Sequence, residues 1–170
     1  MQKWPGAFPH TEFHGIPEGP AGTQATLQRM AKLVREYRQH PTLRQLAVEL
    51  TTQLSNRDYV GELFALRQFV AQYIRYVPDI RETETLHTPL RTIQNRGGDC
   101  DDQAILVATL AETLNKPTRF VAYAFGDSGV FSHVLAQAKV GDSWVSLETT
   151  VPVPLGWSPP DAVNKMVAYV

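Results

Sequence analysis

The chain has 170 residues, 43% of them apolar, and a formal net charge of −1 at pH 7. That length and apolar content suffice for one domain with a continuous core, and the balanced charge excludes a general attraction to nucleic acid or to an acidic membrane. Because no run of about eighteen apolar residues is present, we expect a soluble protein with no membrane partner. The single cysteine cannot form an internal disulfide and the first thirty residues show no export signal, so we expect a cytoplasmic protein or one packaged from the cytoplasm.

Residues 1–22 are predicted to form an extended arm, because their prolines and glycines oppose both a helix and an interior strand. The arm contains Trp4, Phe8 and Phe13, which make it too apolar for a freely solvated tail. We therefore expect the arm either to pack along the domain or to dock on another protein.

Three amphipathic helices are predicted next. In the first, apolar residues recur at helical spacing from Thr23, the expected N-terminal cap, to about Tyr37. The second begins after the interruption at Pro41 and continues to about residue 54, and the third is capped by Asp58 and ends near Tyr76. Their apolar stripes are typical of core packing, so the first half of the chain is predicted to be a helical layer.

The second half is predicted to hold two more helices and then a sheet. Thr88 caps a short helix to about residue 95, which Gly97 and Gly98 end. Asp99 then caps a helix through about Leu114 that is apolar on almost every side and must therefore lie at the centre of the fold. Strands are expected at 119–125, 131–140 and 144–149, followed by a Pro-rich segment from 151 and an edge strand over 166–170.

Cys100 is placed in the first turn of this central helix, where free amide hydrogens and the helix dipole favour an anion. This position lowers the pKa of a thiol and favours a nucleophilic thiolate. The carboxylates of Asp99, Asp101 and Asp102 would raise the same pKa if they pointed at the sulfur, so the thiolate needs a positive partner. The alternative is an inert buried cysteine.

His133 and Glu148 are candidate partners of that thiol. If Gly141 and Asp142 form a two-residue turn, opposed residues of the hairpin have numbers that sum to 283, and Leu135 faces Glu148. His133 and Glu148 then become diagonal neighbours on one face, within reach of a hydrogen bond, whereas a three-residue loop would place them on opposite faces. Glu148 could then fix the imidazole tautomer and steady the imidazolium. The alternatives are a core histidine and a solvated strand glutamate.

Three short blocks resemble those of bacterial and phage transglutaminase-like proteins: Gly-Gly-Asp-Cys-Asp-Asp-Gln at 97–103, Phe-Ser-His-Val at 131–134 and Trp-Val-Ser-Leu-Glu-Thr-Thr at 144–150. The resemblance covers about residues 60–155. It implies an α+β, papain-like fold in which a helical N-terminal layer and a central cysteine-bearing helix pack on an antiparallel β-sheet. It also implies that Cys100 is the nucleophile, His133 the general base and Glu148 the orienting acid. The third position is usually aspartate in the family, so glutamate alters the geometry and leaves room for a copy that keeps the fold without activity.

The residue patterns and the resemblance together give a domain division and two supporting residues. We divide the chain into an arm (1–22), a transglutaminase-like cysteine domain (23–150) and a Pro-rich C-terminal extension (151–170). Gln94, six residues before the cysteine, is similar to the glutamine that donates to the oxyanion in papain-like enzymes, the alternative being an exposed helix residue. Trp144 shares the face of Glu148 and is expected to cover the catalytic pair or to pack in the core.

Three functions are compatible with these residues. The first is a thiol-dependent enzyme that needs no cofactor and acts on a protein or peptide amide through a thioester, with hydrolysis favoured over cross-linking. The second is a non-catalytic assembly module that keeps the fold and binds a larger complex, such as a phage virion, through its arm and C-terminal extension. The third, zinc bound by Cys100, His133 and Asp99, ranks lowest because one thiol and one imidazole make a poor site, and we expect no metal.

Overall fold

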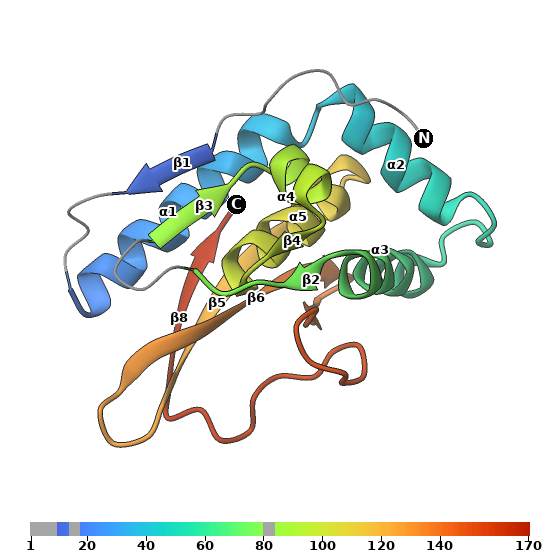
Figure 1. Ribbon diagram of the computed structural model, residues 1–170. Coiled ribbons are helices and arrows are strands. Elements are labelled where there is room, and N and C mark those ends of the chain that lie inside the picture. The colour runs from blue at the N-terminus through green and yellow to red at the C-terminus, as the bar shows by residue number, and fades with distance from the viewer. Residues whose placement is uncertain (1–9, 14–17, 80–83) are drawn as a thin grey trace.

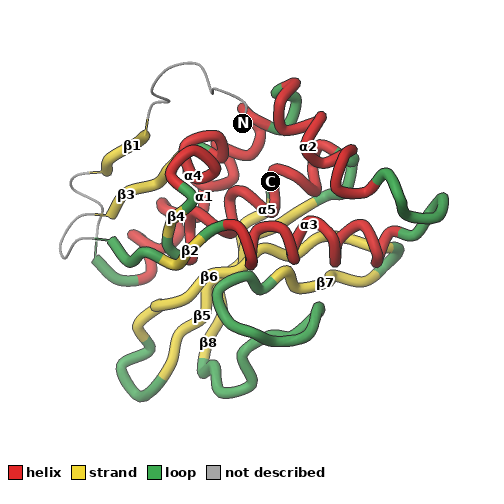
Figure 2. The backbone as a smooth tube through the Cα atoms, turned by 45° about the vertical axis from the view of Figure 1, so that its right-hand side comes forward, coloured by secondary structure: helices red, strands yellow, loops and turns green. Residues whose placement is uncertain are grey.

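The computed structural model describes residues 10–13, 18–79 and 84–170. Within them the helices gather on one side of a four-stranded antiparallel sheet, as Figure 1 shows. The turned view in Figure 2 shows the same two layers, with the loop that follows the last hairpin running along the sheet. This arrangement confirms the predicted α+β class. None of the helices in the described part of the chain is long and apolar enough to span a membrane.

Over the residues that the structure describes, the helical layer consists of five helices close to the predicted bounds. They are α1 (Pro20–Tyr37), α2 (Pro41–Thr51), α3 (Tyr59–Tyr73), α4 (Pro89–Asn95) and α5 (Cys100–Thr113). Asp58 caps α3 by accepting from the Gly61 amide at 2.9 Å, as predicted. The residues that cap α4 and α5 are also those that the sequence indicates.

The start of α1 differs from the prediction. The helix begins at Pro20, and Gly19, which caps it, makes no side-chain capping bond. Proline suits the first helical position because its fixed backbone angle is already helical and its missing N–H would have had no partner there. Thr23 therefore lies inside the first turn, where its hydroxyl donates to the Gly19 carbonyl at 3.4 Å.

The main sheet confirms the hairpin register on which the predicted site depends. It contains β5 (Thr118–Phe125), β6 (Val130–Val140), β7 (Ser143–Leu147) and β8 (Asn164–Tyr169) in the order β7-β6-β5-β8. Val140 pairs with Ser143 across a two-residue turn, and each β6–β7 pair down to Ala136 and Leu147 sums to 283. The last strand confirms the predicted edge strand and joins the C-terminal segment to the sheet through β5.

Two short ladders were not predicted. The first pairs β1 (His10–Phe13) with β3 (Glu84–His87), so this part of the arm packs on the same chain. The other predicted contacts of the arm, those of Trp4 and Phe8, lie outside the described residues. The second ladder pairs β2 (Arg75–Tyr76), which follows α3, with β4 (Gly97–Gly98) in parallel, and so fixes the backbone just before α5.

Helix α5 lies at the centre of the core, as its apolar surface predicts. Almost every residue from Asp102 to Thr113 is buried, and the helix packs against the other helices on one side and the sheet on the other. Phe120 of β5 is fully buried in the same core cluster. The N-terminus of α5 is therefore held from several directions at the residue that carries the thiol.

Candidate active site

Cys100 is the first residue of α5, and its surroundings explain the glycines that precede it. Asp99 caps the helix by accepting from the amides of Asp101 and Asp102, each at 3.1 Å. A Cβ on Gly98 would lie 2.6 Å from the Cβ of Asp102, a distance that side chains do not tolerate. The glycine thus lets the backbone approach the first turn closely enough to form the cap, and the half-buried thiol follows directly.

His133 and Glu148 meet as the hairpin register predicts. Nε2 of His133 lies 2.6 Å from Oε2 of Glu148, a distance typical of a charge-assisted hydrogen bond. Glu148 follows β7 and is 2% exposed, and its other oxygen accepts from the amide and the hydroxyl of Thr150 at 2.7 and 2.8 Å. Burial raises the pKa of Glu148, but the hydrogen bonds and the charge of His133 outweigh burial and hold it below its ordinary value.

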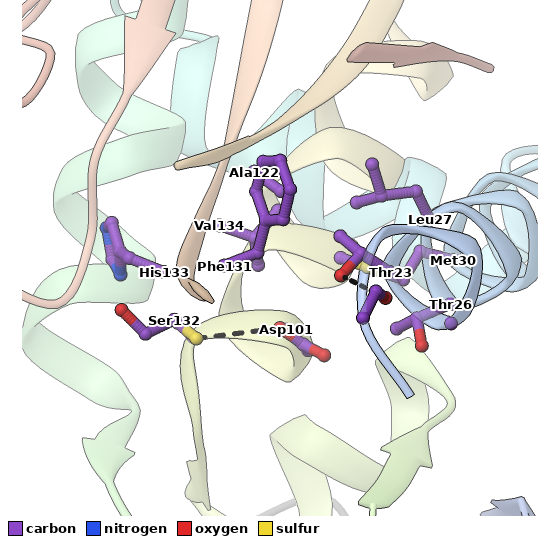
Figure 3. A pocket seen from close by; sticks show the side chains of 13 residues that line it. Thr23, Thr26, Leu27, Met30, Asp101, Ala122, Phe131, Ser132, His133 and Val134 are labelled. Carbon is purple, nitrogen blue, oxygen red and sulfur yellow. Dashed lines mark hydrogen bonds between the residues drawn. The ribbon is translucent and has the colours of Figure 1, made fainter. Parts of the chain in front are cut away.

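Cys100 and His133 both line a pocket of about 330 Å³. One wall comes from α5 and the β6 strand, and the facing wall comes from the first turns of α1, as Figure 3 shows for the labelled residues. The lining residues used below are Thr23, Leu27, Cys100, Asp101, Phe131 and His133. Cys100 and His133 therefore border the same pocket.

The pKa of the Cys100 thiol is raised in this arrangement, against the expectation that the helix N-terminus lowers it. Burial raises the pKa of Cys100 well above its ordinary value, and the charges of Asp101 and Asp99 raise it further, while the main-chain amide of Val134 lowers it. The thiol donates to Oδ1 of Asp101 at 3.5 Å, the dashed line that ends on Asp101 in Figure 3. Burial and the two carboxylates therefore affect the pKa of Cys100 more strongly than the helix N-terminus does. Among the described residues no hydrogen bond joins Cys100 to His133.

Two predicted supporting residues lie away from the pocket. Gln94 is exposed on α4 and accepts from Arg91 at 3.3 Å within its own helix, so the structure does not bring it to Cys100. Trp144 lies toward the far end of β7 and contacts Arg119 and Tyr169. It does not line the pocket. It lies three residues before Leu147, where the β6–β7 ladder ends, and so away from the bond between His133 and Glu148.

A second histidine–carboxylate pair lies beside the first turn of α5. Nδ1 of His87 is 2.6 Å from Oδ2 of the buried Asp102, whose other oxygen accepts from the His87 amide at 2.8 Å. The hydrogen bond to Asp102 is the main reason that the pKa of His87 is raised, although burial opposes it. This pair was not predicted, because the two residues come from different elements and no periodic pattern in the sequence relates them. His87 does not line the pocket.

The acidic groups around Cys100 do not form a metal site in the part of the chain that the structure describes. No group of three or more histidine, cysteine, aspartate or glutamate residues there is arranged to hold an ion. Asp99 serves as a helix cap instead. Burial and the charge of Asp102 raise the pKa of Asp99 to about 7, against the opposing effect of the amides that it caps.

Comparison with protein families gives one match that covers more than half of the chain. Residues 44–149 match the family model described as the transglutaminase-like superfamily. Comparison with curated proteins gives no match.

Solved structures support the same fold at low sequence identity. A candidate cysteine protease from Cytophaga hutchinsonii matches 84% of this chain with a TM-score of 0.55 and 20% identity. Calcium-bound LapG from Legionella pneumophila matches 80% of this chain and 80% of its own, with a TM-score of 0.56 and 18% identity. A candidate protease from Parabacteroides distasonis matches 81% of this chain with a TM-score of 0.56 and 13% identity. The chain spans 55% of the Cytophaga protein and 31% of the Parabacteroides protein.

Proposed function

Because the chain belongs to the transglutaminase-like superfamily, we propose that it is a thiol-dependent acyl-transfer enzyme that hydrolyses amide or peptide bonds. The observation that carries this proposal is the 2.6 Å hydrogen bond between His133 and the buried Glu148 at a pocket that Cys100 also lines. A histidine oriented by a carboxylate beside a thiol is the arrangement that activates a weak nucleophile.

The raised pKa of Cys100 favours a general-base mechanism over a preformed ion pair. Nε2 of His133 is engaged by Glu148, so the other ring nitrogen, Nδ1, takes the thiol proton as the sulfur attacks the acyl carbon. The main-chain amide of Cys100, at the first helical position where amides have no partner inside the helix, supplies a donor for the oxyanion. Rotation of the thiol away from Asp101 precedes the transfer.

The remaining steps form the thioester and then hydrolyse it. The C–N bond of the substrate breaks, the imidazolium returns its proton to the leaving amine, and the acyl group stays on the Cys100 sulfur. Water, deprotonated by His133, then attacks the thioester and releases a carboxylic acid and the free thiol. An amine in place of water would give cross-linking. We favour hydrolysis because the pocket is open to solvent and because two of the similar structures bear the name of proteases.

Alkylation by iodoacetamide tests the proposal without a known substrate. We expect modification of Cys100 near pH 7, and about 100-fold slower modification in His133→Ala, since a general base contributes at least that factor. Cys100→Ala should take up no label. His87→Ala is the matched control, because the side chains of His87 and His133 are 21% and 20% exposed and each bonds a carboxylate at 2.6 Å. Equal rates in wild type and His133→Ala would refute the enzymatic proposal.

The alternative is a non-catalytic assembly module, and one observation favours it. In the resting structure the thiol bonds Asp101, and its raised pKa disfavours the thiolate. A module of this kind would act through binding, in a bacterial cytoplasm or in a phage particle. It would show slow alkylation that does not depend on His133, and it would copurify with a partner that is lost when residues 1–22 are removed.

A further inference from the structure

Arg67 is a charged residue that the fold buries outside the pocket. It lies in the middle of α3 and is 7% exposed. A buried guanidinium is costly unless its donors are satisfied. Nε donates to the main-chain oxygen of Glu148 at 2.5 Å, and one terminal nitrogen donates to the oxygens of Val153 at 2.6 Å and Val151 at 3.5 Å. The other terminal nitrogen donates to Gln68 at 3.4 Å.

Glu148 needs such an anchor because the sheet does not hold its main chain. The β6–β7 ladder ends at the pair Ala136 and Leu147, and the chain then leaves the sheet. The Arg67 side chain donates to the first carbonyl beyond the ladder, on the residue whose carboxylate bonds His133. Its other contacts fix the next turn of the same loop. The guanidinium therefore holds the main chain of this loop, which has no strand hydrogen bonds from the β6–β7 ladder.

We propose that Arg67 is a positioning residue for acyl transfer, which holds the main chain of Glu148 so that its carboxylate stays within hydrogen-bond distance of His133. The inference rests on the function proposed above, because it assigns Arg67 a part in that reaction. Arg67 does not line the pocket and acts through Glu148.

The role requires arginine and not only a positive charge. The guanidinium is planar and presents several N–H groups in a fixed fork, which here serves three carbonyls of one loop. Lysine carries the same charge on a single nitrogen and cannot hold the three acceptors at their present separation. Arg67→Lys therefore keeps the charge and removes the geometry.

The test is the rate of Cys100 alkylation by iodoacetamide near neutral pH. We expect Arg67→Lys to react about 10- to 100-fold more slowly than wild type, since a displacement of about 1 Å in a catalytic group can cost about 100-fold. The matched control is Arg44→Lys, because Arg44 is an exposed arginine of α2, and its rate should equal that of wild type. Melting curves establish that each variant is folded at the assay temperature. An unchanged rate in folded Arg67→Lys overturns the proposal.

A double-mutant cycle separates positioning from general loosening of the fold. If Arg67 acts through Glu148, Arg67→Lys should slow alkylation in the wild-type background and have no further effect in Glu148→Ala. Equal slowing in both backgrounds overturns the proposal. The proposed function fails separately, if His133→Ala alkylates as fast as wild type. A rate that depends on His133 but not on Arg67 refutes this inference alone.

A measurement on the wild-type protein covers the case in which Arg67→Lys does not fold. The Nε–H proton of Arg67 is buried and bonded to Glu148, so it should exchange slowly with solvent. Nuclear magnetic resonance measures this exchange rate. Rapid exchange of this proton, while the main-chain amides of α3 remain protected, would overturn the proposal.

Discussion

Replacing Asp99 with asparagine should stabilise the protein at alkaline pH and leave its stability at acidic pH nearly unchanged. Burial and the charge of Asp102 raise the pKa of Asp99 from its ordinary 3.8 to about 7. A carboxyl group with a raised pKa favours the folded state while it is protonated, and that stability is lost as the pH rises through the folded pKa. Asparagine keeps an oxygen to cap the amides of Asp101 and Asp102 and has no charge to bury.

The size of the effect follows from the two pKa values. One pKa unit corresponds to about 1.36 kcal/mol, so ionising Asp99 in the fold costs at most about 4 kcal/mol above pH 8. Asp99 is partly exposed, so solvent screening reduces this cost. We therefore expect Asp99→Asn to exceed wild type by about 2 to 4 kcal/mol at pH 8.5 and by less than about 1 kcal/mol at pH 4.

Urea unfolding of both proteins at the two pH values measures this difference. Comparison at equal pH cancels the titration of groups that do not interact with Asp99. Asp142→Asn is the control, because Asp142 is exposed on the hairpin turn and its replacement should change stability equally at both pH values. An Asp99→Asn gain that is the same at pH 4 and pH 8.5, or no gain at all, would refute the burial argument.

Three further substitutions test the surroundings of the thiol and the core. Asp101→Asn removes an acceptor and a charge that raise the pKa of Cys100. The pH at which the alkylation rate reaches half its maximum should therefore fall, and alkylation at pH 7 should become about tenfold faster for each unit by which the pKa falls. An unchanged midpoint would contradict this. Gly98→Ala places a methyl group against Asp102 and should cost about 1 to 3 kcal/mol in urea unfolding, and a neutral effect would show that the first turn of α5 can yield. Phe120→Ala should cost about 3 to 5 kcal/mol and lower the melting temperature, unless the core collapses into the space.

Local signals predicted most of the elements and the geometry of one pair. Three helix starts were predicted from their capping residues, Asp58, Thr88 and Asp99. A capping oxygen accepts from an amide only two or three residues further along the chain, so the signal is local. The meeting of His133 and Glu148 followed from turn length and strand parity alone, since a two-residue turn fixes the register of the whole hairpin. The roles of Cys100, His133 and Glu148 in catalysis stay predictions for the experiments above.

Contacts between distant segments could not be predicted in this way. The bond from Arg67 to Glu148 spans 81 positions, and the one between His87 and Asp102 joins a short strand to a helix, so neither has a periodic signal. The direction in which the pKa of the Cys100 thiol shifts could not be predicted from the sequence either. Whether the helix end or the neighbouring carboxylates prevail depends on side-chain direction and burial, which only the folded structure supplies.

Helix α3 and the strand that follows it contact the two segments that carry Cys100 and Glu148. Its continuation, β2, is paired with the glycines that lead into Cys100, while Arg67 in its middle grips the loop that carries Glu148. A displacement of α3 would therefore act on both the segment that precedes Cys100 and the segment that carries Glu148.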